Sequence, residues 1–124
     1  MSNQFRGAYT IKYCTPDLAA GKAFYIKATG VQPYFDEPFY VGFNINGYEL
    51  GLDPDTSVSG AGPGGTVAYW GVEKIEPAFA HLKKIGATVV DEMKEVGEGI
   101  KVATFSDPWG NLIGIIENRH FGLK

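Results

Sequence analysis

Hydrophobic and polar residues follow the short alternation of β-strands along most of the chain, and two segments depart from it. In Leu18–Thr29 and Lys74–Ile85 the apolar residues recur at helical spacing, and a glycine follows each segment. Both segments are therefore predicted to be helices. Thr15 stands before the first of them and is the predicted N-cap.

The remaining apolar runs are rich in β-branched and aromatic residues and are bounded by turn residues, which is typical of strands. Between two of these runs, Asn46-Gly47 is a sequence typical of a two-residue hairpin turn. The predicted strands are residues 8–14, 31–35, 38–45, 48–52, 66–72, 88–91, 100–105 and 112–117. The element order is βαβββ, and it occurs twice.

This repetition predicts the domain organisation. We expect one α+β domain over residues 1–124, made of module one (8–53), a glycine-rich linker (54–65) and module two (66–118). The last hairpins of the two modules can be aligned with Gly47 on Gly110 and Gly51 on Gly114. A chain of 124 residues is long enough to bury a core without disulfides or metals.

The last hairpin of module two carries the most specific motif. Asp107-Pro108-Trp109-Gly110-Asn111 lies between two apolar strands and has turn residues at nearly every position. With the repeated βαβββ order, it resembles the vicinal oxygen chelate superfamily: glyoxalase I, the bleomycin- and fosfomycin-resistance proteins and the extradiol dioxygenases. The resemblance implies that each module curls into a partial barrel, that paired modules enclose a cavity, and that the protein is a homodimer.

The resemblance also implies where a metal would bind. Metal-dependent members place a ligand on the first strand of each module and a glutamate on the last strand of each module. In this sequence those positions fall on Thr10 (or Tyr9, if the register shifts by one), Val67 (give or take one residue), Gly51 and Gly114. A hydroxyl, a valine and two glycines are not a ligand set for a divalent ion. The two histidines lie in the second helix and beyond the last strand, so we expect no metal and no cofactor.

Glu49 is the one carboxylate that this alignment places toward the cavity, because it lies two residues from Gly51 and shares its face of the strand. In an apolar cavity its pKa would be raised, and it could transfer a proton or pair with a cationic ligand. The alternative is a glutamate on an edge strand that reaches solvent. Glu117 has the opposite parity to Gly114 and is expected outside the cavity or at a subunit boundary.

Aromatic residues are abundant on the predicted strands and hairpins, and glycines at 51 and 114 would widen a cavity by removing side chains from its wall. Some of these rings belong to the core, Trp70 among them if Tyr69 faces inward. The predicted ligand-binding residues are Tyr9, Tyr13, Tyr40, Tyr48, Glu49, Tyr69 and Trp109.

Charge and composition narrow the partners. The net charge is −3 and no Lys/Arg cluster occurs, which argues against nucleic acid or an anionic membrane as a partner. A single cysteine cannot form an internal disulfide, and no apolar run is long enough to span a membrane, so a cytoplasmic protein is expected.

Two main functions agree with these observations. The first is a metal-independent protein that binds a small apolar or aromatic molecule, similar to the sequestering resistance proteins. The second is an enzyme of the same superfamily, a lyase, isomerase or dioxygenase-like protein, which uses Glu49 as acid and base or a metal that the alignment missed. A third is a domain kept only for pairing with another protein.

Overall fold

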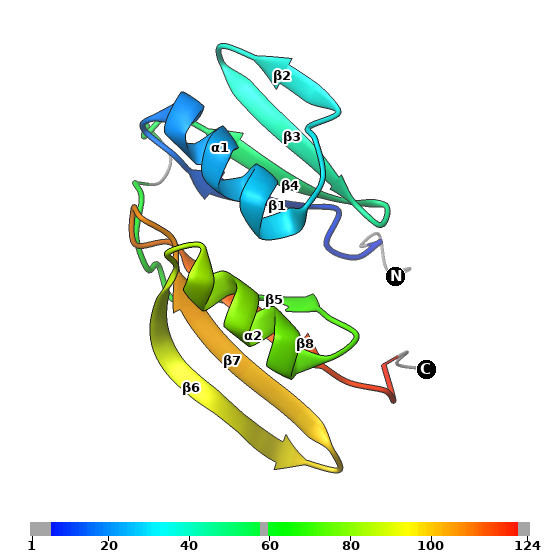
Figure 1. The fold of residues 1–124 in the computed structure, drawn as a ribbon. Helices are drawn as coiled ribbons and strands as arrows, with labels where there is room; N and C mark the ends of the chain where they lie inside the picture. The colour runs from blue at the N-terminus through cyan, green and yellow to red at the C-terminus, as the bar shows by residue number, and fades with distance from the viewer. Residues whose placement is uncertain (1–5, 58–59, 122–124) are drawn as a thin grey trace. The chain divides into compact units, whose positions relative to one another are not determined.

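The structure is a computed structural model that describes residues 6–57 and 60–121. The chain divides into two compact units, unit one (Met1–Ala61) and unit two (Gly62–Lys124), and each has the order βαβββ (Figure 1). The α+β class and the repeated module predicted from the sequence are confirmed. The boundary between the units falls within the predicted linker.

Unit one contains a four-stranded sheet with the order β1-β4-β3-β2. Its elements are β1 (Thr10–Cys14), α1 (Leu18–Thr29), β2 (Phe35–Glu37), β3 (Tyr40–Ile45) and β4 (Tyr48–Asp53). Strand β1 is parallel to β4, while β2, β3 and β4 are successively antiparallel. The register pairs Thr10 with Glu49 and Lys12 with Gly51, so these four residues lie on one face of the sheet.

Unit two repeats this topology with the order β5-β8-β7-β6. Its elements are β5 (Ala68–Gly71), α2 (Ile75–Lys84), β6 (Thr88–Gly97), β7 (Ile100–Ser106) and β8 (Leu112–Glu117). Strand β5 is parallel to β8, as β1 is to β4. Both sheets are open, as expected of partial barrels.

In each unit the helix crosses one face of its own sheet and makes the core with the residues that point to that face (Figure 1). The alternation along the strands explains which residues these are, since every second side chain points to the helix. In unit one they include Val41, Phe43, Leu50 and Leu52, and in unit two Ala103, Phe105, Ile113 and Ile115. The helices add buried residues of their own, among them Tyr25 of α1 and Ile75 of α2. The other face of the first sheet is left to Glu49 and its neighbours.

Helix α1 has the predicted bounds, but its N-cap differs from the prediction. Its N-cap is Asp17, whose carboxylate accepts a hydrogen bond from the amide of Ala20, so the assignment of Thr15 as the cap was wrong. Thr15 is fully buried instead, and its hydroxyl donates to the carbonyl of Tyr13 at 3.1 Å. Its methyl group also explains Gly21: an ideal Cβ on residue 21 would lie 2.2 Å from Thr15 Cγ2.

Two strands of the sheet edges differ from the prediction. Strand β2 begins only at Phe35, and β6 continues to Gly97, six residues beyond its predicted end. The register of β6 shifts three times along its length, and these irregularities break the alternation that sequence reasoning relies on. A second two-residue turn then follows, with positive φ at both Glu98 and Gly99.

The hairpin turns that were predicted do form. Asn46 and Gly47 both have positive φ, as a type I′ turn requires. In the last hairpin, the buried carboxylate of Asp107 accepts hydrogen bonds from the amides of Trp109 and Asn111 and from the Asn111 side chain, each at 2.9 Å. The motif is therefore a turn held by its own aspartate.

Glu117 ends β8 and holds the start of α2. The backbone of Lys74 occupies the N-cap position, but its side chain makes no capping hydrogen bond. The carboxylate of Glu117 accepts one from the amide of Ile75 at 2.8 Å instead, and so satisfies a backbone donor that the helix leaves open. A glutamate from a distant strand replaces the local cap.

Candidate ligand-binding site

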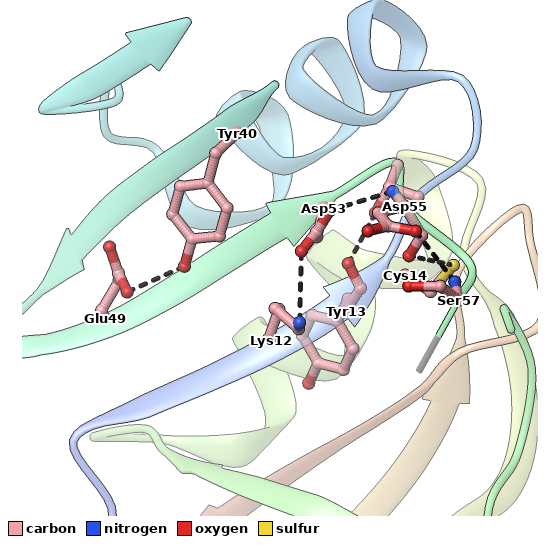
Figure 2. Close-up of polar contacts among 9 residues, drawn as sticks. Lys12, Tyr13, Cys14, Tyr40, Glu49, Asp53, Asp55 and Ser57 are labelled. Carbon is pink, nitrogen blue, oxygen red and sulfur yellow. Dashed lines mark hydrogen bonds and ion pairs between the residues drawn. The ribbon is translucent and has the colours of Figure 1, made fainter. Parts of the chain in front are cut away.

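The main polar cluster of unit one, which we call the Glu49 cluster (Glu49, Thr10, Tyr34 and Tyr40), lies on the sheet face opposite α1. Glu49 Oε1 accepts hydrogen bonds from Thr10 Oγ1 at 3.0 Å and from Tyr40 OH at 2.9 Å, the latter drawn in Figure 2. The hydroxyl of Tyr34 donates to Oε2. Three hydroxyl groups from three parts of unit one thus converge on one carboxylate.

The sheet and the segment before β2 position these donors. Pairing between β1 and β4 sets Thr10 beside Glu49, and Tyr40 opens the neighbouring strand β3. Tyr34 precedes β2 and is held by its own amide, which donates to the carbonyl of Gly42 at 2.9 Å. The sequence argument named Glu49 and Tyr40 but missed Tyr34, whose place depends on the turn between β2 and β3.

Two paired glycines make room for the cluster. An ideal Cβ on Gly51 would lie 1.9 Å from the hydroxyl oxygen of Tyr40, and one on Gly42 would lie 2.6 Å from Glu49 Oε2. Gly42 and Gly51 face each other across β3 and β4. The expectation that Gly51 widens a cavity therefore needs correction, because the side chain of Tyr40 occupies the space that Gly51 leaves.

Unit two uses the same device. An ideal Cβ on Gly114 would lie 2.5 Å from Cδ1 of Tyr69, so a tyrosine ring covers this glycine as well. Tyr69 pairs directly with Gly114 between β5 and β8 and keeps 47% of its surface exposed. In both units, a tyrosine lies over the glycine of the last strand.

The hydrogen bonds of the Glu49 cluster favour the ionised form of Glu49 over the protonated form. Partial burial acts to raise the pKa of Glu49, but the hydrogen bonds from Tyr34, Tyr40 and Thr10 outweigh it, so the pKa lies below its ordinary value. Burial and the bond to Glu49 raise the pKa of Tyr40, and the bond to Glu49 raises that of Tyr34. The predicted rise of the Glu49 pKa was wrong, because the three hydroxyl donors were not foreseen.

An ion pair lies beside the cluster on the same face. Lys12 Nζ lies 3.1 Å from Asp53 Oδ2, and Lys12 pairs with Gly51 in the register of β1 and β4. The ion pair is drawn as a dashed line in Figure 2. Asp53 balances the charge of Lys12, so the ionised Glu49 leaves this face with a net negative charge.

The structure places three other predicted ligand-binding residues away from the cluster. Tyr13 is buried toward α1, where its ring stacks on Tyr25 with 5.7 Å between centroids. Tyr48 precedes Glu49 and so points to the opposite side of β4. Tyr9 is 66% exposed just before β1, and its carbonyl accepts the amide of Glu49 at 2.9 Å.

Tyr69 and Trp109 belong to unit two. Tyr69 lies over Gly114, and Trp109 is half-buried in the turn that Asp107 holds. The two histidines lie elsewhere: His81 is in the last turn of α2, and His120 follows β8, with its ring nitrogen 3.3 Å from the carbonyl oxygen of Glu98. None of the helices in the described parts of the chain is long and apolar enough to cross a membrane.

The chain thus contains two βαβββ units, each with an open, mixed sheet and a helix on one face. The family model described as the Glyoxalase/Bleomycin resistance protein/Dioxygenase superfamily matches residues 8–115, which is most of the chain. The protein belongs to this superfamily, and the resemblance inferred from the sequence is confirmed.

Solved structures agree with this assignment at the level of the fold. A glyoxalase-related enzyme from Fulvimarina pelagi has a TM-score of 0.78 and 21% identity, over 97% of this chain and 94% of that one. Lactoylglutathione lyase from Agrobacterium tumefaciens has a TM-score of 0.74 and 16% identity, over 96% and 98%. A family enzyme from Burkholderia phytofirmans PsJN has a TM-score of 0.75 and 18% identity, over 89% and 97%. No protein of curated function matches the sequence significantly.

The metal site of the metal-dependent members does not fit the residues present. Thr10 uses its hydroxyl to donate to Glu49, and the space beside Gly51 is filled by Tyr40. Val67 and Gly114, the corresponding residues of unit two, carry no metal-binding atoms in their side chains. Within residues 6–57 and 60–121, no three His, Cys, Asp or Glu side chains gather as they would around a metal ion.

Proposed function

We propose that this protein binds a small molecule without a metal, and that the Glu49 cluster is the polar part of its binding site. The observation that carries the proposal is the arrangement of Tyr34 and Tyr40 around one ionised carboxylate on the sheet face opposite α1. Tyrosine rings offer flat apolar contact area at a low entropic cost, and a carboxylate adds orientation and charge selectivity.

The position of the cluster supports this proposal. Gly51 and Thr10 are the residues that the family pattern aligns with metal ligands, and both are part of the surroundings of Glu49. Gly51 leaves space for the side chain of Tyr40, and Thr10 donates a hydrogen bond to Glu49. The Glu49 cluster thus lies at the position where metal-dependent members would bind a metal, and its tyrosines could bind a small molecule there without one. Tyr13, buried against Tyr25, and Tyr48, on the opposite side of β4, do not face the cluster, while the ligand contacts expected of Tyr9, Tyr69 and Trp109 stay predictions.

An enzyme in which Glu49 transfers a proton is the second candidate, and the cluster supports it less well. A general base or acid works best with a pKa near the working pH, whereas hydrogen bonds lower the pKa of Glu49, and burial together with the bond to Glu49 raises that of Tyr40. Both groups are therefore held in the charge state that they already have at neutral pH. The fold that the chain shares with a lactoylglutathione lyase does not transfer that activity to it.

A homodimer is part of the proposal. Strand β2 is an exposed edge of the first sheet, and β6 is an exposed edge of the second, with Val90, Met93 and Val96 on its surface. Open edges with apolar side chains favour pairing with another chain, and a second copy is the partner that the family pattern implies. A cytoplasmic location also stays a prediction, based on the single cysteine.

Two measurements test the proposed function. Elemental analysis of dialysed protein should find no stoichiometric Zn, Ni, Fe or Mn, and a reproducible equimolar content would reinstate the metal-enzyme alternative. Titration with planar aromatic compounds should give micromolar binding, which corresponds to about 8 kcal/mol, because burial of apolar surface and contacts with the tyrosine rings add together. The Tyr40→Leu variant should weaken that binding, while Tyr48→Leu, on the opposite side of β4, serves as the matched control.

A further inference from the structure

We infer that the ligand of the Glu49 cluster is an organic cation whose charged group carries no N–H donors, such as a quaternary ammonium or a delocalised aromatic cation. This inference rests on the proposed function, since it names the chemical class that the same site would bind. Three properties of the cluster lead to this inference. They are its negative charge, the hydrogen bonds that Glu49 already accepts and the aromatic rings of its tyrosines.

The charge of the face selects a cation. Glu49 is ionised at neutral pH because its hydrogen bonds lower its pKa. Asp53 and Lys12 form an ion pair beside it and contribute no net charge together. No other cation is hydrogen-bonded to the cluster among the contacts of the described residues, whose three donors to Glu49 are all neutral hydroxyls. The charge of the carboxylate is stabilised but not cancelled.

The hydrogen bonds of the carboxylate select against strong N–H donors. A carboxylate offers about four lone-pair positions, and three of those of Glu49 already accept from Thr10, Tyr34 and Tyr40. A guanidinium that binds a carboxylate in the bidentate manner needs both oxygens free along one edge, so it would have to displace a hydroxyl. A quaternary ammonium makes no hydrogen bonds and needs only the field of the charge.

The tyrosine rings supply the contact surface for such a cation. A cation is attracted to the negative face of an aromatic ring within about 6 Å of its centre, and this is how proteins recognise quaternary ammonium groups. Each phenol that donates to Glu49 has its oxygen and ring made more electron-rich by the nearby anion. Tyr34 is 63% exposed, so its ring is accessible from solvent while its hydroxyl is fixed on Glu49.

The test compares three probes on the purified full chain by calorimetry or by NMR titration. The first is phenyltrimethylammonium, the second is neutral N,N-dimethylaniline, which has nearly the same shape, and the third is phenylguanidinium. The ammonium should bind at least about tenfold more tightly than the aniline, the charge adding to the ring contacts, and more tightly than the guanidinium. Equal affinity for ammonium and aniline, or tightest binding of the guanidinium, would overturn the inference and leave small-molecule binding intact. Failure of all three to bind would instead refute the proposed binding function itself.

Two variants locate the effect. Glu49→Gln removes the charge and should reduce the preference for the ammonium over the aniline to less than about threefold, with the aniline affinity unchanged. Glu49→Gln also alters the hydrogen bonds of the cluster, so a second variant is needed that leaves them intact. Lys12→Gln removes the cation that lies 3.1 Å from Asp53 and balances its charge, and this variant should tighten ammonium binding severalfold. Lys101→Gln, which breaks the pair with Glu76 in unit two, is the matched control and should change nothing. If Lys12→Gln and Lys101→Gln behave alike, the cation does not bind at this cluster.

Discussion

At the residue scale, two glycines of the first sheet leave space that neighbouring side chains fill. Gly51 was expected from the sequence to widen a cavity, yet the hydroxyl of Tyr40 fills the space beside it, and the carboxylate of Glu49 fills the space beside Gly42. Neither glycine has a left-handed φ, so the reason for glycine here is the close approach of a side chain and not backbone conformation. The Glu49 cluster exists because two strand residues have no Cβ.

Gly51→Ala should therefore disrupt the cluster. The new Cβ would lie 1.9 Å from Tyr40 OH, so the Tyr40 ring must move and lose its hydrogen bond to Glu49. We expect a loss of unfolding free energy of about 2 kcal/mol or more, as for other overpacked sites, measured by urea unfolding. Gly71→Ala is the control, because Gly71 is also in a strand but an ideal Cβ there meets no atom within 4 Å. Equal effects of the two variants would contradict the account.

The hydrogen bonds of Glu49 also predict how stability depends on pH. Because the folded-state pKa of Glu49 is lowered, its contribution is fully present above the unfolded-state pKa of roughly 4.3 and is lost as the pH falls through the folded-state value. Tyr40→Phe removes one donor, so it should destabilise the protein at pH 7 by about 1–2 kcal/mol and lose less stability on acidification than the wild type. Thermal unfolding from pH 7 to pH 3 measures both effects, and Tyr69→Phe in unit two is the control. An unchanged acid profile of Tyr40→Phe would show that the hydroxyl does not hold the charge.

At the scale of elements, the start of each helix is capped by a residue that sequence reasoning did not assign to it. The capping residue of α1 is Asp17 and not Thr15, and the start of α2 depends on Glu117 from β8. In the first case two capping residues lie close together in sequence, and burial of Thr15 decides between them. In the second, the partner is 42 residues away and only the packing of α2 on β8 brings it near.

Glu117→Ala should destabilise unit two through the start of α2. The variant leaves the amide of Ile75 without its partner and removes a negative charge from the N-terminus of the helix. A loss of about 1 kcal/mol is expected from the value of helix caps, with the larger change in the exchange protection of the α2 amides. Glu73→Ala, which removes a charge at the same end of the helix from an exposed position, is the control. If Glu73→Ala lost as much unfolding free energy as Glu117→Ala, the removed charge and not the lost hydrogen bond would explain the effect.

Gly21 in α1 provides a test of packing against intrinsic propensity. Alanine is a better helix former than glycine by about 1 kcal/mol, yet its Cβ at this position would lie 2.2 Å from Thr15 Cγ2. Gly21→Ala should therefore destabilise the protein, and Thr15→Ser, which removes that methyl group, should restore part of the loss. A double-mutant cycle by chemical unfolding measures the coupling. Additive effects, or a stabilised single variant, would show that the helix shifts freely.

At the scale of the whole molecule, two similar units each leave one face of an open sheet uncovered by their own helix. The edges β2 and β6 carry exposed apolar residues, among them Phe35 on β2 and Val96 on β6. We propose a second copy of the chain as the partner of these edges, because open edges with apolar side chains favour pairing.

Light scattering should accordingly give a mass of twice the chain's 13.4 kDa at micromolar concentration. Val96→Lys on β6 and Phe35→Lys on β2 place a charge on each exposed edge in turn, and charged edges resist pairing. The variant that shifts the mass toward the monomer identifies the edge in contact, with Tyr48→Lys as an exposed control. A wild-type protein of 13.4 kDa would refute the dimer.

The sequence by itself determined the elements and their order, because these follow from local patterns. Helical spacing in Leu18–Thr29 predicted α1 with both ends correct, and the turn residues around Asp107 predicted the last hairpin. Repetition of the order then led to the superfamily. Where the pattern was irregular, as in the bulged strand β6, local reasoning ended the strand too early.

Only the tertiary structure decided what surrounds Glu49. The alternation of β4 predicted the face on which it lies, since it shares parity with Gly51. The three hydroxyls that lower its pKa come from residues 10, 34 and 40, and their convergence depends on strand register and on the turn before β3. A pKa is set by such neighbours in space, and they are brought together only by packing. For that reason the sequence named the carboxylate but predicted the wrong direction for its pKa.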